Sequence, residues 1–433
     1  MLFSKIRMID ENFEVLDDMY VGVERDKITY ISKEEPSYED KKKYGEIFDG
    51  RKKILMPGFY NTHAHSPMSL LRGYGENLPL NRWLTEKIFP FEANLDGYSV
   101  FWGTMLSMAE SIRCGIVSTT DMYYFIDDMV KAISISGTKN NICRAIANVF
   151  GDDPKTLPAF KEMSDAIIMY DGFNNGRIIT EAGLHAEYTN DDRTVRAVVE
   201  CAKELEVGIH VHIAETELET RECKERRNGM TPVEYFDSFG MFDCKTNAAH
   251  CVWLTDNDRD ILARNNVTVA SNPVSNMKLA SGICNVPELY KKGINVSIGT
   301  DGPASNNSLD FFEEMKIFAL CGKALSKDAA AMNTKDVLYS ATRGGALAQG
   351  REDCGFIKEG FKADLIVIDT DVPNMMPEYD LLNNLVFSAC GKDVCLTMVD
   401  GHTLYQNGEF LTIDLEQAER ESKNCIKRIL SKL

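Results

Sequence analysis

The chain has 433 residues, enough to bury a large core, and its 44% hydrophobic and 26% charged content is ordinary for a water-soluble globular protein. Its formal net charge of −18 argues against nucleic acid or an anionic membrane as a partner, because both attract basic surfaces, and leaves small molecules as the expected partners. No leader-like start, no run of 18 uncharged apolar residues and no C-x-x-C pair among the 12 cysteines is present, so we expect a cytoplasmic protein with free thiols.

Alternating apolar residues at the start of the chain predict a small antiparallel sheet. Val21 and Val23 precede a polar turn at residues 25–27, and Ile28 and Tyr30 follow it. After Met56 the pattern changes to apolar strand, polar loop and amphipathic helix, repeated along the chain. The expected strands cover residues 56–65, 115–123, 143–150, 178–186, 208–215, 247–254, 267–274 and 294–301. Eight β-then-α units in succession predict a (β/α)₈ TIM barrel over residues 57–354.

The last part of the chain returns to β-structure. Asp400-Gly401 and Asn407-Gly408 are hairpin signals between apolar runs. We therefore expect residues 1–56 and 355–414 to pair into a small accessory β-sandwich domain built from both chain ends. Residues 415–433 are expected to form a final charged helix.

An H-x-H motif, His63 and His65, stands at the end of the first expected barrel strand. Alternate side chains of a strand share one face, so both imidazoles can bind the same metal ion. Such a short motif also occurs by chance in surface or core positions. It gains weight here because the chain has only seven histidines, and His402, in a predicted hairpin, is expected to lie outside any site.

Further polar residues fall at or near the ends of other expected strands, where active sites of this fold lie. Of the two histidines in the fifth strand, we expect His212 to be a metal ligand and His210 to pack behind the site. His185 ends the fourth strand and His250 lies in the sixth. A lone histidine such as His250 is more often a satisfied core residue, but its position at a strand end of a metal-binding barrel favours a role in the site. Asp301 ends the eighth strand in a GTDGP segment that also suits a turn or a helix cap.

These residue types suit metal-assisted hydrolysis. A divalent ion held by imidazoles and a carboxylate lowers the pKa of a bound water to about 7. Asp301 can take the proton of that water, and Glu215, three residues after His212, can protonate the group under attack. His250 can hold the nucleophile or polarise the substrate. Because His185 stands where a lysine would be needed to bridge two metals, we predict a single metal ion.

Longer motifs give the chain a specific resemblance. It resembles the amidohydrolase superfamily, and within it the methylthioadenosine and S-adenosylhomocysteine deaminase branch, together with related triazine hydrolases. The resemblance covers nearly the whole chain and is carried by MPGFYNTHAHSPMSLLRGYGENLPLNRWL, HIAETELE, NAAHCVWL, SNPVSNMKLASG, GTDGPASNNSLD and GFIKEGFKADLIVID. It implies the metal ligands His63, His65, His212 and Asp301. It also implies that Glu92 binds the two ribose hydroxyls, that His185 contacts the nucleoside and that Trp83 lines the base pocket.

One departure concerns the 5′ end of the substrate. Relatives active on adenosylhomocysteine typically place two arginines after the third strand to hold the amino-acid carboxylate. Arg144 is present here, but Lys155 and Thr156 occupy the region of the second arginine. A lysine offers a point charge without the bidentate fork of arginine, which weakens the case for adenosylhomocysteine as a substrate.

The predicted function is metal-dependent deamination of an adenine nucleoside to the inosine analogue and ammonia. Methylthioadenosine, 5′-deoxyadenosine, adenosine and S-adenosylhomocysteine are the candidate substrates. One alternative is hydrolysis of another heteroaromatic ring, such as guanine, a pterin or a chlorotriazine, and another is a catalytically inactive binding module on the same barrel. Zinc is the expected metal, but the ligand types also suit iron or manganese, and a homo-oligomer is compatible with the sequence.

Overall fold

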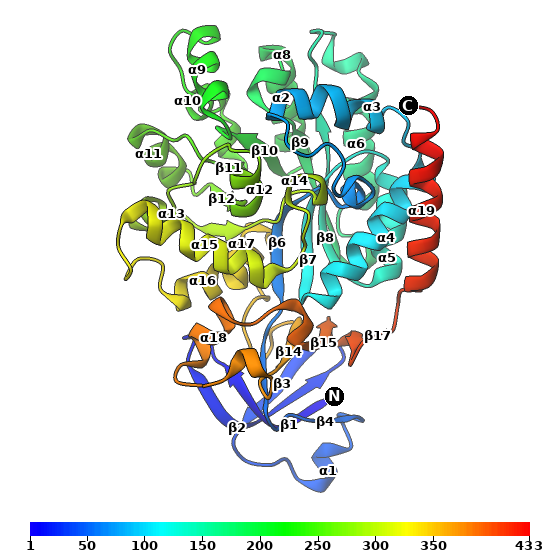
Figure 1. The fold of residues 1–433 in the computed structure, drawn as a ribbon, viewed down its shortest axis with the longest axis vertical. Helices are drawn as coiled ribbons and strands as arrows, with labels where there is room; N and C mark the ends of the chain where they lie inside the picture. Colours follow the sequence, from blue (N-terminus) through cyan, green and yellow to red (C-terminus); the bar gives the residue numbers. More distant parts are fainter.

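The computed structural model describes residues 1–433, apart from the side chain of Asn81. Its main body is a sheet of eight parallel strands, in chain order from β6 to β13, wrapped into a nearly closed barrel with helices outside it (Figure 1). The strands are β6 (Phe59–Ala64), β7 (Ile116–Met122), β8 (Lys139–Ile146), β9 (Ile178–Leu184), β10 (Gly208–Ile213), β11 (Thr246–His250), β12 (Thr268–Ser271) and β13 (Val296–Ile298). The last strand returns to the first, because the Asp301 N–H donates to the His63 carbonyl at 2.9 Å. The predicted parallel barrel is confirmed.

Helices connect the barrel strands and bury one face against them. In the helix at Gly97–Arg113, for example, Asp96 caps the first turn, and Met105, Met108 and Ile112 are buried. The helices between β6 and the final sheet strands are α2 (Leu80–Trp83), α3 (Phe89–Glu92), α4 (Gly97–Arg113), α5 (Ile126–Ser136), α6 (Pro158–Tyr170), α7 (Phe173–Gly176), α8 (Asp192–Glu204), α9 (Glu217–Arg226), α10 (Pro232–Asp237), α11 (Asp256–Arg264), α12 (Pro273–Lys278), α13 (Val286–Lys291), α14 (Pro303–Asn306), α15 (Phe311–Ser326), α16 (Thr334–Ala341) and α17 (Arg343–Ala348). None of the helices in the described part of the chain is long and apolar enough to cross a membrane.

A second sheet lies beside the barrel and draws strands from both ends of the chain (Figure 1). Its order is β17-β16-β15-β14-β5-β1-β2-β3, with β4 paired to β1. The strands are β1 (Leu2–Ile9), β2 (Val15–Glu24), β3 (Lys27–Ser32), β4 (Ile47–Asp49), β5 (Lys53–Pro57), β14 (Leu365–Asp369), β15 (Val394–Val399), β16 (His402–Gln406) and β17 (Glu409–Phe410). The remaining helices are α1 (Tyr38–Lys41), α18 (Leu381–Phe387) and α19 (Leu415–Leu430), the last of which runs beside α4 (Figure 1).

The observed strands are shifted or shortened relative to the expected ranges, and two of these differences have a clear physical cause. Met56 and Pro57 belong to β5 of the second sheet, and Gly58 separates them from β6. A side chain at Gly58 would collide with Val117, since a Cβ there would lie 2.2 Å from its Cγ1. The third barrel strand begins at Lys139 rather than Cys143, because the polar residues Lys139 and Asn141 are buried and bonded: Lys139 pairs with Asp364 at 2.5 Å.

Candidate active site

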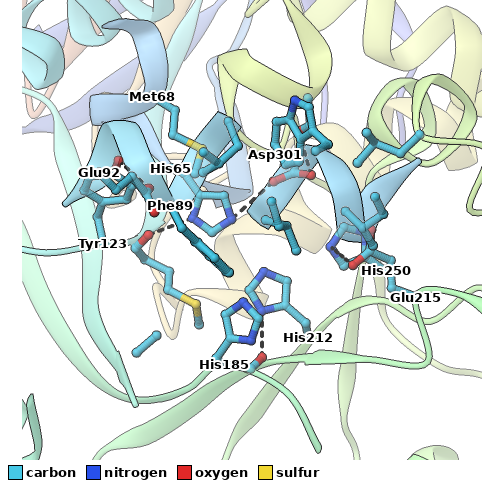
Figure 2. Close-up of a pocket in the computed structure, with 18 of the residues that line it drawn as sticks. His65, Met68, Phe89, Glu92, Tyr123, His185, His212, Glu215, His250 and Asp301 are labelled. Carbon is cyan, nitrogen blue, oxygen red and sulfur yellow. Dashed lines mark hydrogen bonds and ion pairs between the residues drawn. The ribbon is translucent and has the colours of Figure 1, made fainter. Parts of the chain in front are cut away.

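The carboxyl ends of the barrel strands bring four histidines and two carboxylates to the lining of one small cavity (Figure 2): His65, His185, His212, His250, Glu215 and Asp301. His63 lies against this group. Two groups of possible metal ligands, each with ligand atoms within 4.8 Å of one another, share His63. They are His63, His212 and His250, and His63, His65 and Asp301. The four residues predicted from the resemblance as metal ligands therefore lie within one cluster.

Each of these imidazoles is held by its Nδ1 atom. His65 Nδ1 lies 2.7 Å from the Met122 carbonyl oxygen, and His212 Nδ1 lies 2.7 Å from the His185 carbonyl oxygen. His63 Nδ1 lies 2.8 Å from Nε2 of His210, which itself contacts Asn247. His210 thus packs behind the cluster, as predicted. Fixing Nδ1 leaves Nε2 of each ring to face a ligand, as is usual for metal-binding histidines.

The cluster fits a divalent metal ion. His63 Nε2 is buried and has no hydrogen-bond partner, an unfavourable state for a polar atom that nothing coordinates. Two other Nε2 atoms and the Asp301 carboxylate converge with it, and imidazole plus carboxylate is a donor set for zinc and other first-row ions. The donors present therefore match a metal site without rearrangement of the chain.

Asp301 is positioned by the backbone turn that follows β13. Its φ of 61° is in the left-handed region, so the chain bends sharply and the carboxylate points back over the barrel. Oδ1 lies 3.3 Å from His65 Nε2, while Oδ2 accepts hydrogen bonds from Ser275 at 2.5 Å and Ser305 at 2.9 Å. Burial opposes ionisation, but the neighbouring imidazoles, whose Nε2 atoms lie 3.5 Å (His63) and 3.3 Å (His65) from Oδ1, hold the pKa of Asp301 well below its usual range.

Burial also sets the charge of the histidines. It lowers the pKa of His63 to about 3 and that of His185 to about 4, so both rings are neutral at pH 7. At His65 burial is outweighed by the Asp301 carboxylate, which raises the pKa to about 9. A bound cation would compete with that proton, because metal ligands must be deprotonated.

Glu215 and His250 form a pair at one side of the cavity (Figure 2). Glu215 Oε2 lies 3.8 Å from His250 Nε2, and Glu215 Oε1 accepts a hydrogen bond from Ser281 at 3.3 Å. Burial raises the pKa of Glu215, which favours a carboxyl group that can donate a proton. His250 Nδ1 lies 2.8 Å from Asn276 Oδ1, which orients the ring.

A second buried carboxylate beside Glu215 was not predicted from the sequence. Glu219 accepts the backbone N–H groups of Ala214 at 3.0 Å and Glu215 at 2.8 Å, and so holds the turn after β10. Burial raises its pKa to about 8. Its position four residues after Glu215 in HIAETELE was a usable signal, because an acidic residue in the first turn of a helix often binds free backbone amides.

Three residues assigned to the substrate by resemblance line the same cavity. Trp83, Glu92 and His185 all border it, and its volume is about 100 Å³. Glu92 lies opposite Glu215 across the cavity (Figure 2) and accepts a hydrogen bond from the Tyr123 hydroxyl at 2.7 Å, a contact that the sequence did not reveal. Burial raises the pKa of Glu92 to about 7.

Arg144 and Lys155 do not border this cavity. Arg144 lies on β8 and lines a neighbouring cavity that also contacts Glu92. Lys155 is exposed in the 3₁₀ turn at Pro154–Thr156, outside the residues that line either cavity. His402 is exposed on β16 of the second sheet.

The chain was compared with known proteins. A model described as the amidohydrolase family matches residues 54–404. A 5-methylthioadenosine/S-adenosylhomocysteine deaminase from Dictyoglomus thermophilum is 41% identical, over 88% of this chain and 90% of that protein. A 5′-deoxyadenosine deaminase from Methanosarcina mazei is 39% identical, over 95% and 94% respectively. An adenosine deaminase from Xanthomonas campestris, solved with bound zinc, is 29% identical and similar with a TM-score of 0.92, over 99% of this chain and 98% of that chain.

The matched segment contains the whole barrel and most of the second sheet's C-terminal strands. The relatives are similar over almost their entire length. The resemblance seen in the sequence motifs is thereby confirmed: this chain belongs to the amidohydrolase family.

Proposed function

We propose that this protein is a metal-dependent aminohydrolase that converts an adenine nucleoside and water to the inosine analogue and ammonia. The observation that carries the proposal is the meeting, around one cavity, of a metal-ligand cluster, the Glu215–His250 pair and the half-buried Glu92. Relatives named as deaminases of methylthioadenosine, adenosylhomocysteine and 5′-deoxyadenosine, at about 40% identity, support the same reaction.

We assign the metal to His63, His65, His212 and Asp301, and we propose one zinc ion. The unpartnered His63 Nε2 and the bound zinc of the Xanthomonas neighbour support this assignment. A bound divalent ion would lower the pKa of a water molecule to about 7 and so supply the nucleophile.

The protein's own groups move the protons. Glu215, whose pKa is raised by burial, gives its proton to the ring nitrogen next to the carbon under attack. Asp301 takes a proton from the attacking water and delivers it to the departing amine, and Ser275 and Ser305 hold its carboxylate in place. His250, oriented by Asn276, holds the water on the side of Glu215.

Substrate recognition is assigned to three residues that line the same cavity as Glu215. Glu92 binds the two ribose hydroxyls, Trp83 covers the base and His185 contacts the nucleoside. The test is ammonia release from a panel of adenine nucleosides, adenine, guanine and pterins. Release from the nucleosides is expected, whereas activity confined to guanine or a pterin would contradict the proposal.

Several broader assignments are also proposals. The second sheet is proposed to form an accessory β-sandwich domain from residues 1–56 and 355–414, outside a catalytic domain at 57–354, with residues 415–433 as a C-terminal helix. Its strands do come from both ends of the chain. A cytoplasmic location is proposed because all 12 cysteines are free. A homo-oligomer stays a prediction.

Glu92→Ala is expected to impair ribosides far more than the free base. Removing this carboxylate deletes charge-assisted hydrogen bonds to the ribose, worth about 1.5–3 kcal/mol of binding. The measurement is kcat/KM for adenosine and for adenine with the variant and the parent protein. An equal loss on both substrates would show that Glu92 does not contact the sugar.

Short neutral 5′ groups are expected to be accepted at least as well as the homocysteine tail. With Lys155 outside the cavities that border Glu92, a long tail gains few contacts to offset the entropy lost on ordering it. Specificity constants for methylthioadenosine, 5′-deoxyadenosine and adenosylhomocysteine, measured side by side, provide the check. A preference of tenfold or more for adenosylhomocysteine, about 1.4 kcal/mol in transition-state binding, would overturn this expectation.

A further inference from the structure

The small cavity at the metal cluster adjoins a second cavity, with which it shares Phe89, Glu92 and Tyr124. At about 100 Å³ the first cavity is smaller than the roughly 300–1,000 Å³ of ordinary ligand pockets, so a nucleoside must extend out of it. The cavity beyond Glu92 measures about 440 Å³ and is lined by Phe89, Glu92, Tyr124, Arg144 and Glu162, among others. A larger cavity on the other side, about 760 Å³, borders Glu215 but not Glu92.

The position of Glu92 therefore indicates which of these two larger cavities receives the 5′ end of the substrate. If Glu92 binds the ribose hydroxyls, as the proposed function requires, the nearest room for a 5′ substituent is the cavity that Glu92 shares with Arg144 and Glu162. The charge of those two side chains then determines which substituents fit.

The guanidinium of Arg144 is already engaged. Its Nε lies 2.6 Å from Oε2 of Glu162, on α6, and its Nη1 donates to the backbone carbonyl of Ala145. Its central carbon lies 4.7 Å from the centroid of the Tyr124 ring, a cation–π distance. The Arg144 side chain is only 15% exposed, whereas Glu162 is 39% exposed on the solvent side of the pair.

This pairing changes what the cavity can bind. A free arginine beside Glu92 would attract a carboxylate tail through its fork of N–H donors. Here an anionic tail would compete with Glu162 for Arg144, and it would also approach Glu92, the other carboxylate of the cavity. Among the described residues that line this space, Arg144 is the only cation. A neutral or cationic tail does not compete with Glu162 for Arg144 and is not repelled by the Glu92 carboxylate.

We propose that Glu162 is a specificity-determining residue that neutralises Arg144 and excludes anionic 5′ substituents, so that the substrates are adenine nucleosides with a neutral or cationic 5′ group. This proposal rests on the proposed function. It depends on the contact between Arg144 on β8 and Glu162 on α6, two residues that lie 18 positions apart in the sequence.

The experiment uses the metal-loaded, full-length protein and three nucleosides. They are methylthioadenosine, a 5′-carboxyethylthio adenosine and a 5′-aminopropylthio adenosine, so that tail charge varies while the reacting base stays the same. The wild type is expected to favour both the neutral and the cationic compound at least tenfold over the anionic one in kcat/KM. Glu162→Gln should raise the ratio of anionic to neutral substrate at least tenfold, because it removes the competing charge and keeps the shape.

Asp165→Asn is the matched control. It removes one negative charge from the same helix, where Asp165 pairs with Lys161 rather than Arg144, and should leave the ratio within twofold. Glu162→Ala is a second variant in case Gln retains the Arg144 contact, and metal content and thermal melting verify that each variant is folded. An unchanged ratio in both folded Glu162 variants, or an equal change in Asp165→Asn, would overturn the proposal. If the wild type deaminates none of the three compounds, it is the proposed function that fails.

Discussion

Removal of the metal is expected to abolish deamination, and added zinc or another divalent ion is expected to restore it. The nucleophile depends on a water whose pKa falls to about 7 at a bound ion, compared with 15.7 in bulk water. The check is turnover of methylthioadenosine after treatment with a chelator and after reconstitution, together with elemental analysis.

Substitution of the ligands should show the same dependence one residue at a time. His63→Ala, His65→Ala, His212→Ala and Asp301→Ala are each expected to lower metal content and activity together. His402→Ala is the control, because His402 is exposed on the second sheet, and it should change neither. Full turnover by a chelated sample shown to be free of metal would refute the assigned chemistry.

Glu215→Gln is expected to reduce turnover by about two to four orders of magnitude, the usual contribution of a positioned general acid. The amide keeps the size of the side chain and can still contact Ser281, so metal content and KM should stay near those of the parent protein. The check is to measure kcat, KM and metal content of the purified variant.

Glu217→Gln is the matched control for that variant. Glu217 is exposed in the first turn of α9, two residues from Glu215, and its loss should leave kcat unchanged. Loss of metal from Glu215→Gln would instead make Glu215 a ligand, and an unchanged kcat would remove it from the proton-transfer steps.

The local patterns of the sequence were sufficient for the barrel and for the candidate metal cluster. Strand periodicity placed His63 and His65 on one face, and the succession of strands and helices placed His185, His250 and Asp301 near strand ends, which meet at one edge of a closed parallel sheet. Periodicity also predicted the strands of the second sheet. It missed the polar start of the barrel strand β8, because Lys139 is buried in an ion pair with Asp364 rather than among apolar side chains.

Strand periodicity does not distinguish the two histidines of the H-x-H pair in β10, His210 and His212. His210 and His212 share a face, so spacing alone treats them alike. In the structure His210 contacts Nδ1 of His63, whereas His212 lies beside the cavity.

Short-range periodicity and motifs of contiguous residues were enough to identify the family, the parallel barrel and the residue types of the candidate metal centre. The contacts of Tyr123 with Glu92 and of Glu162 with Arg144 were instead set by the tertiary structure. Such pairs join side chains from different elements. Their distances depend on how the helices pack against the barrel, which no spacing along the chain records.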